Sequence, residues 1–182
     1  MTIKQALVVA TVVGLVASAA AAAPPKGWKT YTDTKHGWSI SYPANFKVST
    51  DYSPEGLDFP ITGVSFSVPD SYAKGTNLDE ASISVETRAG KDCKGAQFVD
   101  PVETEGKLKA DGRVYRTATS SDAGMSKYYA TSIFIIDGTC MAVRYFTHST
   151  SPGVYDPPPK VFDDKKLDKL FDSIRATLTL KK

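Results

Sequence analysis

Histidine is scarce in this chain, which has only His36 and His148 among its 182 residues. Serine hydrolysis needs a base that takes the hydroxyl proton and an acid that orients this base. Neither histidine has an acidic neighbour in the sequence, and no Gly-x-Ser-x-Gly motif marks a nucleophile. We therefore predict that neither histidine is catalytic and that the protein is not an enzyme. The alternative is that the protein is a hydrolase. His148 would then be the base, and the nucleophile would be Ser149, Thr150 or Ser151.

Metal and cofactor motifs are also missing. The two histidines are far apart, and no His-x-x-x-His spacing or calcium-binding loop pattern occurs. There is no Gly-x-Gly-x-x-Gly and no Gly-Lys-Ser/Thr loop to cradle a phosphate. The pair Asp163-Asp164 is better explained as the start of a helix than as a metal ligand pair. The sequence predicts no metal and no cofactor.

Charge of one sign is not in excess, since 22 basic residues face 20 acidic ones. They are interspersed, whereas nucleic-acid binders cluster Lys and Arg on one face, so no nucleic-acid partner is predicted.

The long hydrophobic run is confined to the N-terminus, where Lys4 precedes an apolar stretch over 6–16 and an alanine-rich stretch over 17–23. This order is typical of a secretory signal peptide, and the run is too short to span a bilayer. Among several possible cut points we favour cleavage after Ala22, because a cut after Ala23 would place Pro24 directly after the bond. We predict a signal peptide over 1–22, no membrane span and no lipid anchor. A single domain over 23–182 would then be periplasmic or secreted.

Only two cysteines are present, Cys93 and Cys140. In an exported protein such a pair is typically a structural disulfide. The alternative, a reactive thiol, lacks the Cys-x-x-Cys spacing that lowers a thiol pKa.

Alternating residues predict strands through most of the chain. The pattern is clear over 38–42, 64–68 and 81–85, with 28–31 as a partner strand. Serines and Glu86 alternate with the apolar residues, which predicts an antiparallel sheet with one solvent-exposed face. Asp137-Gly138 joins apolar runs over 128–136 and 139–147, which predicts a tight hairpin. A neighbouring strand is expected over 114–120, with its turn at 121–124. The stretch 93–109 stays open, with at most a helical turn in 97–102.

The C-terminal part predicts an amphipathic helix. Leu167, Leu170, Phe171, Ile174 and Leu178 form one apolar stripe, Asp163 is the expected N-cap, and a short strand should follow over 177–180. A helix of this kind covers a sheet face, so the fold class is α+β with a twisted antiparallel sheet.

Three stretches carry a resemblance to known proteins. The segments 31–33 and 37–43 (Gly-Trp-Ser-Ile-Ser-Tyr-Pro) resemble the start of PsbP-like domains, and 167–180 resembles their end. The segment 146–150, with Tyr155-Asp156-Pro157 and the helix after it, resembles uncharacterised exported proteobacterial proteins. The resemblance implies an α/β/α sandwich that serves mainly to dock onto other proteins. It assigns no functional residue.

Two features are candidates for recognition. The proline-rich segment 148–160 contains His148 and presents Tyr155, although it also reads as a rigid connector from hairpin to helix. The strand tyrosines Tyr115, Tyr128, Tyr129 and Tyr145 are expected to be mainly core, with interface contacts as the alternative. The function these observations favour is a non-catalytic binding or accessory protein that contacts another envelope protein. The alternatives are a small periplasmic hydrolase and an extracellular inhibitor or ligand carrier.

Overall fold

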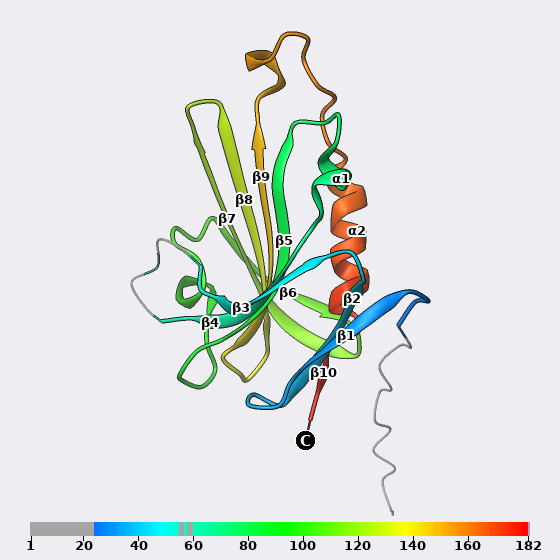
Figure 1. Cartoon of the computed structure of the whole chain (residues 1–182). Coiled ribbons are helices and arrows are strands. Elements are labelled where there is room, and N and C mark those ends of the chain that lie inside the picture. The colour runs from blue at the N-terminus through cyan, green and yellow to red at the C-terminus, as the bar shows by residue number, and fades with distance from the viewer. Residues whose placement is uncertain (1–23, 55–56, 58–59, 182) are drawn as a thin grey trace, which may run out of the picture.

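The computed structural model describes residues 24–54, 57 and 60–181, so the predicted signal peptide lies outside the described residues. Within them the strands are β1 (Trp28–Asp33), β2 (Trp38–Pro43), β3 (Lys47–Tyr52), β4 (Thr62–Ser67), β5 (Leu78–Thr87), β6 (Thr104–Ala110), β7 (Arg113–Gly124), β8 (Lys127–Ile136), β9 (Met141–Thr150) and β10 (Thr179–Leu180) (Figure 1). The α-helices are α1 (Asp70–Ala73) and α2 (Asp164–Arg175). Single 3₁₀ turns are η1 (Gly95–Gln97) and η2 (Pro152–Val154).

The strands form two antiparallel sheets. The larger one has seven strands in the order β3-β4-β5-β9-β8-β7-β6, and the smaller one has the order β1-β2-β10. The predicted strand 28–31 pairs with the predicted strand 38–42, and the C-terminal residues pair with the other edge of β2. The antiparallel α+β fold class is confirmed.

One face of the large sheet carries the main core. Phe66, Ile83 and Val143 are buried there, and the small sheet adds Trp38 and Ile40. Helix α2 packs against the same core through the predicted stripe, of which Leu167, Phe171, Ile174 and Leu178 are at most 1% exposed. The Asp163 carboxylate accepts a hydrogen bond from the Lys166 amide at 2.9 Å, which confirms the predicted N-cap.

The second face of the large sheet is not uniformly exposed, which corrects the prediction. On β5 the alternate residues Ser82, Ser84 and Glu86 are at most 5% exposed. We call residues 88–103 the cover, because its residues Phe98 and Val99 pack over this face as part of a second hydrophobic cluster. Alternation of polar and apolar residues reports which residues share a face, but it cannot report whether a distant segment lies on that face.

The cover also replaces the second helical layer of the expected sandwich. Helix α2 lies on one face of the sheet, whereas η1 is the one helical turn that the structure describes in the cover. Thus only part of the predicted 97–102 turn forms, shifted toward the N-terminus.

Two hairpin connections differ from their predictions in detail. The β8–β9 hairpin forms, but its loop has four residues and only Gly138 takes a positive φ (77°). The β7–β8 turn is not at 121–124, which continues β7, but at Met125 and Ser126. Both of these residues have positive φ (51° and 63°), the backbone that a two-residue hairpin requires for its twist. Met-Ser is a rare sequence for such a turn, so sequence patterns missed it.

Candidate functional site

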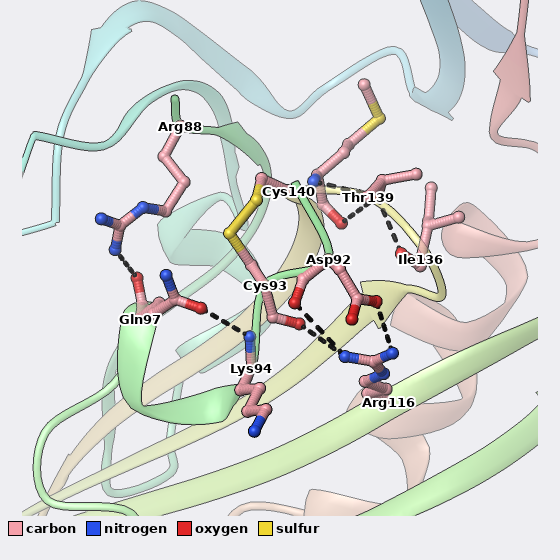
Figure 2. Close-up of a disulfide and its surroundings, with 10 residues drawn as sticks. Arg88, Asp92, Cys93, Lys94, Gln97, Arg116, Ile136, Thr139 and Cys140 are labelled. Atoms are coloured by element: carbon pink, nitrogen blue, oxygen red, sulfur yellow. Dashed lines mark hydrogen bonds and ion pairs between the residues drawn. A yellow bond between two sulfur atoms is a disulfide. The ribbon is translucent and has the colours of Figure 1, made fainter. Parts of the chain in front are cut away.

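The predicted disulfide between Cys93 and Cys140 is present and joins the cover to the β8–β9 loop, with 4.9 Å between the two Cα atoms (Figure 2). Both residues are buried. Around them, the Cys93 amide donates to the Thr139 carbonyl at 3.0 Å, and the Arg116 guanidinium bonds the Asp92 side chain and the Cys93 carbonyl. Both cysteines are therefore used in the bridge, and neither thiol is free among the described residues.

Beyond the cover, the second face of the large sheet opens into a groove. We call it the second-face groove; it has a volume of about 580 Å³ and is lined from β3, β4, β5, β8 and β9. Its lining includes Tyr52, Ser65, Ser82, Tyr129, Arg144 and Phe146. Strand register explains this set, because Ser82 pairs with Phe146 and Phe146 pairs with Thr131, so residues of three neighbouring strands face the same side.

A buried ion pair forms the floor where the groove meets the cover. The Arg144 Nε donates to Glu86 Oε1 at 2.6 Å, and Nη2 donates to Oε2 at 3.1 Å and to the Phe98 carbonyl at 2.6 Å. The Ser84 hydroxyl donates to Glu86 Oε1 at 2.8 Å. The Glu86 side chain is fully buried and that of Arg144 is 7% exposed. This pair therefore fixes the cover to β5 and β9 through the Phe98 carbonyl. No local sequence pattern relates Glu86 to Arg144, because the two residues lie 58 positions apart.

Tyr52 reaches over the groove from β3 and stays neutral. Burial raises the pKa of its phenol to about 12, and the negative charge of Glu86 acts in the same direction. The positive charge of Arg144 and a hydrogen bond with Ser84 oppose this shift. Tyrosine is ordinarily neutral at physiological pH, and the raised pKa keeps this phenol neutral at still higher pH.

His148 stands at the rim of this groove and not in the proline-rich loop. Its ring stacks on Tyr129 with 4.4 Å between centroids and 5° between planes, and Phe146 lies 6.5 Å from Tyr129. The His148 Nε2 is 3.6 Å from an Asp79 carboxylate oxygen.

An acid therefore lies near each histidine, although none is adjacent in the sequence. His36 Nδ1 contacts the Asp33 carboxylate at 2.7 Å, because a turn brings residue i−3 back to the ring. Asp79 approaches His148 from a neighbouring strand at a register irregularity. Neither the Asp33–His36 contact nor the Asp79–His148 contact joins residues that are adjacent in the sequence.

Tyr155 lies at one end of the molecule in an exposed apolar group. We call Met125, Tyr128, Val154 and Tyr155 the tip; their exposed fractions are 98%, 51%, 55% and 45%. The β7–β8 hairpin and the segment after β9 project at the same end (Figure 1), and the Ser151 amide donates to the Ser126 carbonyl at 2.7 Å. Tyr155 therefore lies at the tip, whereas His148 packs on Tyr129, so the two residues of the predicted recognition loop belong to different surfaces.

Of the other strand tyrosines, Tyr115 and Tyr145 are core residues, at 0% and 5% exposed, as expected. Burial raises the pKa of both phenols. Tyr128 is instead an exposed tip residue, and Tyr129 is half-buried at the groove.

Among the described residues, no group of three or more His, Cys, Asp or Glu is placed to hold a metal ion. In the same part of the chain, no helix has the length and apolar character needed to cross a membrane.

Comparisons with known proteins give likeness of fold only. No family model and no curated protein matches the chain. A crystal structure from Bacteroides thetaiotaomicron VPI-5482 is similar over 86% of this chain, with 15% identity and a TM-score of 0.51. This chain spans 49% of that protein's length. The solution structure of cyanobacterial PsbP (CyanoP) from Synechocystis sp. PCC 6803 is also 15% identical, over 93% of this chain and 98% of that one. Its TM-score is 0.45, a superposition too weak to assign a fold by itself.

Proposed function

We propose that this protein is a non-catalytic accessory protein of PsbP-like architecture that acts outside the cytoplasm by binding another envelope protein through the tip. The single observation that carries the proposal is the gathering of exposed apolar side chains at one end. Met125, Val154 and Tyr155 stand there on two chain segments that are hydrogen-bonded to each other. Grouped exposed apolar residues mark interaction sites, whereas isolated ones need no explanation.

The tip is held in place before any partner binds. Asn77, which is 7% exposed, clamps both ends of the segment that carries Tyr155. Its side-chain amide donates to the Thr150 carbonyl at 2.9 Å, and its side-chain oxygen accepts from the Phe162 amide at 2.9 Å. A loop held at both ends loses less conformational entropy on binding, which supports a role in recognition.

The compartment is supported by the disulfide, since such bonds persist in oxidising environments. The non-catalytic character is supported by the groups in the groove, where Glu86 and Arg144 neutralise each other and the His148 ring stacks on Tyr129. A hydrolase would need a base free to accept a proton from a nucleophile.

A photo-crosslinking amino acid at Tyr155 tests the proposal in the intact organism or its envelope extract. We expect one dominant crosslinked protein, which disappears when Met125→Ser is added. The matched control is the same amino acid at Leu180, which is 37% exposed and belongs to β10, a strand that lies away from the tip (Figure 1).

Tyr155→Ala should leave the melting temperature within a few degrees, because an exposed side chain adds little to stability. Two outcomes oppose the proposal. One is the same crosslinks at Leu180 as at Tyr155. The other is a loss of about 3 kcal/mol of unfolding free energy in Tyr155→Ala, which would mark a core residue.

A further inference from the structure

Most of the residues that line the second-face groove carry a hydroxyl group. No hydrogen-bond partner exists among the described residues for the side-chain hydroxyls of Ser65, Ser67, Ser82 and Thr131. None of these oxygens is among the atoms sealed from solvent without a partner. Each hydroxyl is both a donor and an acceptor, so together they match a molecule that presents many hydroxyls of its own.

The electrostatics of the groove favour an uncharged molecule. Arg144 is neutralised by Glu86 on its floor, and the Tyr52 phenol is uncharged at physiological pH, as tyrosine ordinarily is. The remaining carboxylate, Glu80, lies in the lining and repels anions. Glu80 is the one acidic residue in the described lining, and a single exposed carboxylate binds a cation weakly.

Arg144 supplies one fixed donor. Its Nε and Nη2 are held by Glu86 and the Phe98 carbonyl, whereas Nη1 has no hydrogen-bond partner in the part of the chain that the structure describes. Nη1 is also not sealed from solvent, and Arg144 lines the groove. A guanidinium held at two nitrogens offers the third in a fixed direction, so little entropy is lost when a ligand oxygen accepts from it.

Aromatic rings supply the apolar part of the lining. Phe146 and Tyr129 lie side by side, and His148 stacks on Tyr129 and fixes its ring. Sugar rings carry hydroxyls around their edges and C–H groups on their faces. A lining with aromatic surface next to hydroxyls contacts both parts of such a ring.

We infer that the second-face groove binds a neutral saccharide. The volume of about 580 Å³ lies within the range of roughly 300–1,000 Å³ found for small-molecule sites. This inference does not depend on the proposed function, because the tip and the groove share no residue.

The test is a titration of the purified protein with four neutral trisaccharides: cellotriose, maltotriose, triacetylchitotriose and mannotriose. Binding is followed by backbone amide NMR shifts. We expect at least one trisaccharide to bind saturably with a Kd below about 10 mM. The shifted amides should lie on β5, β8 and β9 around the groove. Inorganic phosphate, the anionic probe, should not shift the same amides.

Tyr129→Ala should weaken the binding at least tenfold by removing the aromatic contact. Tyr128→Ala is the matched control, because this neighbour on β8 belongs to the tip and should bind the trisaccharide like the unchanged protein. Should Tyr129→Ala fail to fold, Thr131→Val removes a groove hydroxyl at nearly constant volume and should weaken binding.

Three results would each overturn the inference. The first is no saturable shift with any of the four trisaccharides. The second is binding that maps elsewhere or is equal in the groove variants. The third is phosphate binding in the groove more tightly than every sugar.

Discussion

The buried pair of Arg144 and Glu86 gives the sharpest prediction about stability. Arg144→Met keeps most of the side-chain length but removes the guanidinium. The Glu86 carboxylate, fully buried, would keep the Ser84 hydroxyl and lose both bonds from Arg144, at 2.6 and 3.1 Å. The Phe98 carbonyl in the cover would lose its donor at 2.6 Å.

The magnitude follows from these contacts. Hydrogen bonds to charged groups contribute about 1.5–3 kcal/mol each, so two of them set a loss of roughly 3–6 kcal/mol. Breaking a buried pair by removing one partner costs about 3–5 kcal/mol, because it leaves an uncompensated buried charge. We therefore expect Arg144→Met to lower the free energy of unfolding by about 4 kcal/mol.

Replacing both partners should cost less than the two single changes together, because no buried charge is left alone. For Glu86→Leu with Arg144→Met we expect a coupling free energy of about 2 kcal/mol or more in a double-mutant cycle. Urea unfolding followed by tryptophan fluorescence measures all four proteins, since Trp38 is 1% exposed in the fold and becomes exposed on unfolding.

Arg116→Met is the matched control on the same face. The Arg116 guanidinium binds Asp92 and Asp137 at the surface, where solvent screens ion pairs, so its loss should be far smaller than that of Arg144→Met. The reasoning is refuted if Arg144→Met costs about 1 kcal/mol or less, or if the double change costs the sum of the single changes.

Two further predictions concern the disulfide and the Asp33–His36 contact. Changing Cys93 and Cys140 to Ala should lower stability by about 4 kcal/mol for a bridge spanning 47 positions. Non-reducing peptide mapping should recover the linked pair, and two free thiols in the purified, unreduced protein would disprove the bridge. Burial of Asp33 opposes its ionisation, but hydrogen bonds from the His36 ring and amide, together with the ring's charge, lower the pKa of this carboxyl. The stabilisation is thus present above the ordinary pKa of Asp and is lost as pH falls through the lowered value. His36→Ala should raise the pKa of Asp33 in a carbon-13 NMR titration, and an unchanged titration would contradict the contact.

The sequence was sufficient to predict the elements whose residues repeat with a regular period. The β8–β9 hairpin and helix α2 were both predicted, because alternation and the 3.6-residue stripe record which side of an element is buried. The N-cap at Asp163 was predicted for a similar reason, since capping depends on residues three positions apart.

The candidate site depends instead on residues that are distant in the chain. Nothing local in the sequence relates Glu86 to Arg144, and the serines of β5 look the same whether they face solvent or the cover. The cover has no period because it is a loop held by a disulfide and by side-chain hydrogen bonds. Its position is set by tertiary contacts, which periodicity does not record.

Strand geometry makes the two proposed recognition surfaces separable. Successive side chains of a strand point to opposite faces, so Tyr128 belongs to the tip while Tyr129, the next residue of β8, lines the second-face groove. A partner protein at the tip should respond to Tyr128→Ala and ignore Tyr129→Ala, and a saccharide in the groove should respond in the opposite way. Because both surfaces include residues of β8, a change that disturbs the β7–β8 hairpin itself would affect both at once. The pair of single substitutions therefore distinguishes loss of a binding surface from loss of the fold.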